Sequence, residues 1–175
     1  MVASAWKLPM LRCLLAVLAL IACGAAAGLA LHLAIAKGDT MFAGKRPDYL
    51  GVKDGRLARP KRTPNCVSSQ ADPADAVHYI APIAFKGNAL DAIAAARKAV
   101  ESMPRATVIR HEGNYLYAEF RSRLLGFVDD VEFTHDEKAG VLHVRSASRL
   151  GRSDWGVNRA RVEQLRSRLE RRIAA

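Results

Sequence analysis

The sequence predicts an α+β fold: a four-stranded antiparallel sheet in two layers with two flanking helices, preceded by one transmembrane helix. Three observations carry this prediction. Residues 13–31 form an uncharged apolar run. Four short segments rich in β-branched and aromatic residues follow one another between residues 106 and 148. An amphipathic segment lies on each side of these four. Consecutive strands between two helices are typical of a sheet with its helices gathered on one face.

The N-terminal run has the length of a membrane span. Its apolar character continues to Ala36, and Arg12 and Lys37 bracket it. At about 1.5 Å rise per residue, a helix of this length would cross the roughly 30 Å hydrocarbon core of a bilayer. The membrane would then be a partner of the chain through this helix.

We therefore expect residues 1–36 to be an anchor in a bacterial inner membrane. The short leading segment favours a single-pass protein with its domain in the periplasm. Two alternatives involve processing: a lipoprotein cleavage box before Cys23, and signal cleavage after residues 25–27.

Residues 37–62 are rich in Gly, Pro and basic residues, which is typical of a juxtamembrane linker. The α+β domain is expected over residues 63–175. Two of the three cysteines lie in the apolar run, so Cys66 has no partner for a disulfide within the domain. Cys66 is either a small packed residue where the linker meets the domain or a nucleophile with His78 as its base.

Capping and turn residues mark where the helices and strands of the domain begin and end. Asn88 can cap a helix that Pro104 ends, and Gly113 suits the tight turn of a hairpin. The final helix begins near the cap residue Asp154 and runs to about Arg172. The predicted strands are residues 106–111, 115–122, 127–134 and 141–148.

The third predicted strand carries acidic residues among apolar ones. Asp129 shares the core face with Val131, whereas Asp130 and Glu132 point to the other face. A turn around residues 136–140 sets the register with the fourth strand. The expected pairs are Asp129–Ser146, Asp130–Arg145 and Glu132–His143. We interpret the outer face as an exposed ladder of charges. The alternative is a metal site formed by Asp130, Glu132 and His143.

A carboxylate on the core face costs several kcal/mol unless it is paired, so Asp129 needs partners. The candidate polar cluster is Asp129, Ser146, Ser148, Arg149, Asp154, Asn158 and Arg161. It is either a network that locks the sheet to the last helix or a pocket for an anionic ligand with Arg149 and Arg161 as donors. No catalytic role, metal or cofactor is assigned to it. A Ser–His–Asp triad is geometrically awkward, because His143 points away from Ser146 and Ser148.

The chain has a formal net charge of +10, and its last 31 residues hold nine Arg against three acidic residues. Such a balance favours an anionic partner surface. We expect a protein partner or an anionic lipid. Nucleic acid is not expected, because the Arg side chains are not interleaved with aromatic ones. The leading hypothesis is a non-enzymatic binding or structural domain of the cell envelope. The alternative is a hydrolase-like enzyme that uses Asp129, Ser146 and Ser148.

Three ordered motifs carry a family resemblance: Thr-Pro-Asn-Cys-Val-Ser-Ser-Gln at 63–70, Phe-Val-Asp-Asp-Val-Glu-Phe at 127–133, and the polar run 145–159. Together they resemble the bacterial and plastid family called domain of unknown function 1499, over about residues 57–169. The resemblance implies a membrane-anchoring N-terminus in many members, and no established activity, cofactor or substrate. It also implies a second Cys shortly before Pro-Asn-Cys in many members, where this chain has Arg59-Pro60-Lys61.

Overall fold

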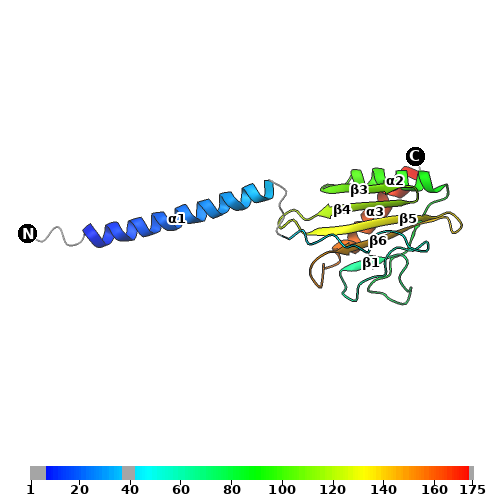
Figure 1. The fold of residues 1–175 in the computed structure, drawn as a ribbon, viewed down its shortest axis with the longest axis horizontal. Helices are drawn as coiled ribbons and strands as arrows, with labels where there is room; N and C mark the ends of the chain where they lie inside the picture. The colour runs from blue at the N-terminus through cyan, green and yellow to red at the C-terminus, as the bar shows by residue number, and fades with distance from the viewer. Residues whose placement is uncertain (1–6, 37–41, 174–175) are drawn as a thin grey trace, which may run out of the picture. The chain divides into compact units, whose positions relative to one another are not determined.

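The computed structural model describes residues 7–36 and 42–173, and the chain divides into two compact units, residues 1–40 and 41–175 (Figure 1). The described part of the first unit is the helix α1 (Lys7–Ala36). The elements of the second unit are β1 (Cys66–Ser68), β2 (Ile83–Ala84), α2 (Ala89–Glu101), β3 (Ala106–Glu112), β4 (Tyr115–Arg121), β5 (Val128–Asp136), β6 (Val141–Ser148) and α3 (Val157–Ile173).

The prediction of a transmembrane helix is wrong. Within the described ranges, no helix combines the length and the hydropathy needed to cross a bilayer. The absence of formal charge was a weaker criterion than sustained apolarity, because residues such as Gly24, Ala25 and Ala26 offer little apolar surface. The predicted single-pass location in an inner membrane, with a periplasmic domain, is wrong with it, and the membrane as a partner through this helix is not supported. The two processing alternatives stay predictions, and residues 1–6 and 37–41 lie outside the described part of the chain.

The strands form one six-stranded sheet, so the predicted four-stranded sheet is wrong. Its order is β1–β6–β5–β4–β3, β2 also pairs with β6, and all these pairings are antiparallel. The four predicted strands correspond to β3–β6. The two additional strands are three and two residues long, too short to show the period-two alternation by which a strand is recognised in a sequence.

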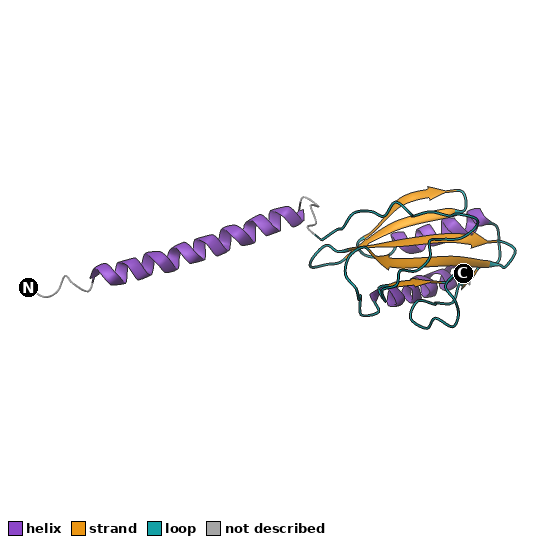
Figure 2. Cartoon of the chain, turned by 60° about the horizontal axis from the view of Figure 1, so that its bottom comes forward, coloured by secondary structure: helices purple, strands orange, loops and turns teal. Residues whose placement is uncertain are grey.

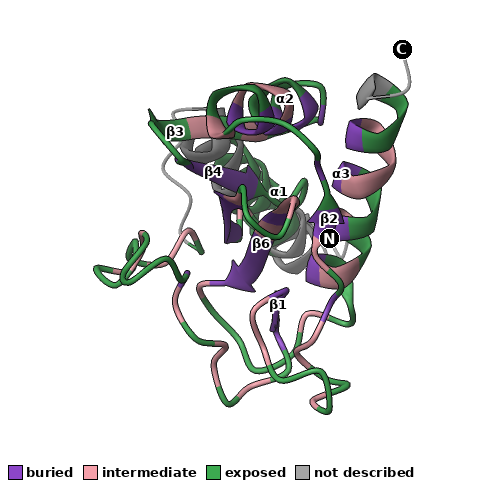
Figure 3. Ribbon diagram, turned by 90° about the vertical axis from the view of Figure 1, so that its right-hand side faces the viewer, coloured by how far each residue is buried: buried purple, intermediate pink, exposed green. Residues whose placement is uncertain are grey.

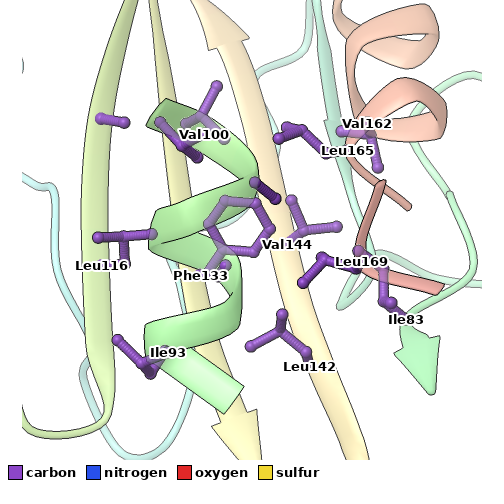
Figure 4. Close-up of a cluster of buried hydrophobic side chains, with 14 of the residues drawn as sticks. Ile83, Ile93, Val100, Leu116, Phe133, Leu142, Val144, Val162, Leu165 and Leu169 are labelled. Atoms are coloured by element: carbon purple, nitrogen blue, oxygen red, sulfur yellow. The ribbon is translucent and has the colours of Figure 1, made fainter. Parts of the chain in front are cut away.

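Helices α2 and α3 lie together on one face of the sheet (Figure 2). The cap that the sequence predicted for α2 is present, since Asn88 Oδ1 accepts a hydrogen bond of 2.9 Å from the Asp91 amide. The core between helices and sheet is apolar (Figure 4). Its central side chains are Ile93 and Val100 of α2, Leu116, Phe133, Leu142 and Val144 of the sheet, and Val162, Leu165 and Leu169 of α3.

The register of β5 and β6 differs by two residues from the predicted one. Asp129 lies opposite Ser148, and Glu132 lies opposite Arg145. The third predicted strand extends further toward the hairpin than expected, because β5 runs to Asp136 and pairs there with Val141, whereas β6 has the predicted bounds. A slip of two residues preserves the side on which each side chain lies, so the assignment of residues to the two faces was correct although the pairs were not.

The second face of the sheet is covered rather than exposed (Figure 3). The irregular segment 42–55, here called the strap, is held against this face by polar contacts with strands β4 and β5 and with Arg149, directly after β6. Leu50 of the strap and Leu57 just after it pack against Tyr115 and Tyr117. The predicted exposed ladder is therefore wrong, because this segment buries it.

Candidate functional site

The helix-side cluster joins the sheet to the start of α3. Asn158, fully buried in the first turn of α3, donates from Nδ2 to Ser148 Oγ at 2.9 Å and to the Asn65 carbonyl at 3.1 Å. Arg161 lies one turn further along the helix. It donates to Asp129 Oδ2 at 2.5 Å and to Ser146 Oγ at 3.0 Å. The carboxylate of Asp129 therefore has a cationic partner among the residues that the sequence had singled out.

Asp154 completes this cluster from the loop just before α3, which begins at Val157. Its carboxylate accepts hydrogen bonds from the Gly156 amide at 3.1 Å and from the Asn158 amide at 2.7 Å. Trp155, which lies between Asp154 and Gly156 in the sequence, has a positive φ of 51° and is 96% exposed. The cluster thus fixes the loop between β6 and α3 in one conformation.

The hydrogen bonds of the helix-side cluster connect the sheet to α3 and favour a structural role. The Ser146 hydroxyl donates to Asn158 Oδ1 at 2.5 Å, and Ser148 Oγ accepts from Asn158. Neither hydroxyl has a histidine partner among the described residues, and a serine nucleophile needs such a base. Six of the seven predicted cluster residues meet here; Arg149 does not, because it lies on the opposite face.

Arg149 belongs to a second group, here called the strap-side cluster. Its members are Tyr115, Tyr117, Glu119, Asp130, Glu132 and Arg145 of the sheet, Arg149 directly after β6, and Arg46 of the strap. Alternation along β4, β5 and β6 places all the sheet residues of this group on one face. Most of these residues had not been identified as site candidates from the sequence, because the face was expected to be exposed.

One half of the strap-side cluster is centred on Arg149. Its guanidinium donates to both oxygens of Asp130 and to Glu119 Oε1, and it also reaches the Tyr117 hydroxyl at 2.9 Å. Burial alone would raise the pKa of Glu119, but hydrogen bonds from Arg149 and Arg46 hold that pKa below its ordinary value. Burial, together with the bond to Asp130, raises the pKa of Tyr117. The Glu119 carboxylate is therefore ionised in the folded protein, and Tyr117 is neutral.

The other half is the buried ion pair between Glu132 and Arg145. Arg145 Nη1 lies 3.0 Å from Glu132 Oε2, and the other carboxylate oxygen accepts from the Tyr115 hydroxyl at 2.7 Å and the Gly51 amide at 2.8 Å. Glu132 is thereby satisfied. Two nitrogens of Arg145, Nε and Nη2, have no hydrogen-bond partner although the side chain is only 1% exposed.

The remaining sequence candidates lie apart from one another. Cys66 is buried in β1, and burial raises the pKa of its thiol, which disfavours the thiolate that a nucleophile requires. Both ring nitrogens of His78 face acceptors, Asp75 Oδ2 at 2.7 Å and the Thr63 carbonyl at 3.2 Å. This leaves neither nitrogen free to act as the base for Cys66.

The metal alternative is not assembled in the structure. Asp130 pairs with Arg149 and Glu132 with Arg145, whereas His143 Nδ1 lies 3.1 Å from Ser69 Oγ. Across residues 7–36 and 42–173, no group of three His, Cys, Asp or Glu side chains is placed to hold a metal ion.

A groove of about 820 Å³ opens between two loops beside β1. One wall carries four basic side chains, and the other carries Asp72, Asp75 and His78. The basic residues are Arg56, Arg59, Lys61 and Arg62. These residues fall in the segment 37–62 that was predicted to be a linker, because it has no helical or strand periodicity.

The second unit is thus an α+β domain with a charged cluster on each face of its sheet and a basic groove at one edge. The sequence model of the DUF1499 family, described as a protein of unknown function, matches residues 56–169. The chain therefore belongs to this family, as the three sequence motifs predicted. No curated protein matches the chain at a significant level.

Proposed function

We propose that the domain is a non-enzymatic binding module that receives an acidic segment of a partner protein in the basic groove. The single observation that carries this proposal is the state of Arg59 and Arg62. Both are exposed in the groove wall, and neither makes a hydrogen bond or ion pair with any described residue. Free guanidinium groups are well suited to bidentate pairing with carboxylates.

The acidic side chains of the groove do not cancel these charges. Asp75 accepts from His78 through both its ring and its backbone, and Asp72 accepts from the Ala74 amide. Their carboxylates are held within their own loop. Lys61 and Arg56 are likewise engaged, with the carbonyls of Ser148 and Gln70. The unused binding capacity of the groove is therefore cationic.

The hydrolase alternative has less support. It requires a nucleophile with an adjacent base, and the serines of the helix-side cluster are instead bonded to Asn158. The pair of Ser69 and His143 has such a contact, but Ser69 is buried and accepts from the Val144 amide at 2.9 Å. The geometry of both places favours structural hydrogen bonding.

The test uses a fluorescein-labelled hexaglutamate peptide and polarisation at moderate ionic strength. We expect Arg59→Glu/Arg62→Glu to weaken binding at least tenfold, since each lost contact is worth about 1 kcal/mol and reversal adds repulsion. The matched control is Arg123→Glu/Arg152→Glu, two exposed arginines outside the groove lining with the same change in net charge.

An equal loss in both double variants would contradict the proposal, because it would mean attraction by the net charge alone. A second arm uses vesicles of phosphatidylglycerol. If the groove variant loses binding to these vesicles but not to the peptide, the ligand of the groove is a lipid surface and not an acidic protein segment.

A further inference from the structure

The strap places an arginine in a site made by the sheet. Arg46 donates from Nε and Nη2 to Glu119 Oε1 at 2.9 and 2.6 Å, and its guanidinium carbon lies 5.6 Å from the centre of the Tyr117 ring. The side chain of Glu119 is 5% exposed, whereas that of Arg46 is 51% exposed. A buried carboxylate beside an aromatic face is a cation-binding arrangement, and Arg46 is its outer, replaceable member.

The same face contains donors that the folded chain leaves unused. The Nε and Nη2 groups of buried Arg145 have no partner, and the ring of Tyr49 from the strap lies 5.5 Å from its guanidinium carbon. An unmade hydrogen bond at a buried charged group costs about 1–3 kcal/mol or more. Tyr49 offers the Arg145 guanidinium a cation–π contact, whereas an oxygen acceptor reaching Arg145 from the strap side would make the missing hydrogen bonds.

The strap is also separate from the family domain in sequence. Residues 42–55 precede the matched region 56–169, whereas all the sheet residues of the strap-side cluster lie inside it. The strap pairs with no strand of the sheet. Apart from Arg46, its polar contacts include the Gly51 amide on Glu132 and the Gly44 carbonyl, 3.5 Å from Arg149 Nη1. A segment held in this way can leave without breaking the sheet.

We propose that the strap-side cluster is a second binding site, for an extended arginine-containing segment of another protein, and that the strap occupies it as an internal substitute. Glu119 and Tyr117 receive the guanidinium of that segment. Arg145 receives an acceptor oxygen, a carboxylate or carbonyl, once Tyr49 has moved away. This site is independent of the basic groove, whose lining includes none of these residues.

The probe is the strap itself, supplied as a labelled peptide with the sequence of residues 44–51. The full chain with Arg46→Ala leaves Glu119 without its strap partner. We expect this variant to bind the peptide at least tenfold more tightly than the unmodified chain. Lys45→Ala is the matched control, since Lys45 is exposed, adjacent and equally charged. A peptide with citrulline in place of arginine keeps the shape, loses the charge, and should lose the gain.

Equal affinities of the three chains, or equal binding of the citrulline peptide, would overturn the proposal. If Arg46→Ala does not fold, hydrogen exchange on the unmodified chain decides instead. Saturating arginine peptide should speed exchange of the Gly51 amide, which Glu132 protects in the closed state. Unchanged exchange at Gly51 would mean that the strap is a fixed part of the fold.

Discussion

Replacing Arg145 by methionine removes the cation from the buried pair with Glu132. Methionine has a similar length and no charge, so the main change is electrostatic. The carboxylate of Glu132, fully buried and 3.0 Å from Arg145, then loses its only cationic hydrogen-bond partner among the described residues. Tyr115 and Gly51 still donate to it, but neither carries a charge.

The expected loss of stability is about 3–5 kcal/mol, the range for removing one member of a buried pair. Two features of the site move the value toward the lower end. The two remaining donors stabilise the Glu132 carboxylate, and Arg145 itself leaves two nitrogens unpaired in the native state. A loss near 3 kcal/mol would still be a large part of the 5–15 kcal/mol that typically separates folded from unfolded domains.

Urea denaturation followed by circular dichroism measures this loss. Urea is preferred because guanidinium is a ligand candidate for the Glu119 site. Glu132→Leu/Arg145→Met, which removes both charges, should recover much of the loss. The control Arg97→Met disrupts the half-exposed pair with Glu101 and should cost under about 1 kcal/mol. If Arg145→Met stays within about 1 kcal/mol of the unmodified chain, the pair is not buried as described.

Two further predictions concern the helix-side cluster and pH. Asp129→Ala should cost more than about 1 kcal/mol, because it leaves Arg161 largely buried without its carboxylate; an unchanged urea midpoint would contradict this. Burial lowers the pKa of His143 in the folded protein below its ordinary value of 6.5. As the pH falls, His143 therefore takes up a proton in the unfolded chain before it does so in the folded one. The contribution of His143 to stability is fully present above about pH 6.5 and is lost as the pH drops toward the folded pKa. His143→Gln should flatten urea midpoints measured from pH 7.5 to 5, whereas the exposed control His111→Gln should keep the original slope; two equal slopes would refute the assignment.

Local signals in the sequence were sufficient for most of the domain. Asn88 caps α2 as predicted, and the four longer strands lie where β-branched residues gather. Helix α3 begins at Val157, three residues after the predicted cap Asp154, whose carboxylate still accepts from the Asn158 amide. Strands β1 and β2 were not predicted, because they form by pairing with the distant strand β6 and segments of two or three residues carry no recognisable strand pattern. The register slipped because the positions of hairpin ends depend on turn geometry, which period-two alternation leaves open.

The candidate site was predicted in part. Alternation assigned Asp129 to the core face. The same rule could have placed the side chain of Arg149 on the other face from its neighbour Ser148, together with Asp130. The burial of that second face could not be read from β4–β6. It depends on residues 42–55, which lack periodicity and precede the domain by sequence. The available signal was an unusual one: acidic residues and Arg145 inside strands that are otherwise apolar.

The strap-side face of the sheet carries charged side chains, whereas a face with a purely structural role would carry apolar ones. Apolar side chains of similar volume usually stabilise a buried face as well as ion pairs do, or better. Here the strap instead adds a half-exposed pair through Arg46, worth about 0–1 kcal/mol, and a charge-assisted bond from Gly51, worth about 1.5–3 kcal/mol. These two polar contacts sum to a few kcal/mol, and the packing of Leu50 and the ring contact of Phe42 with Phe127 add to them. A ligand needs about 5.5 kcal/mol of differential affinity to move a two-state equilibrium from 1:99 to 99:1. An arginine that replaces Arg46 only restores the contact that it displaces. The differential affinity for the open state therefore comes from the acceptor that bonds the two free nitrogens of Arg145, worth about 1–3 kcal/mol or more for each unmade bond.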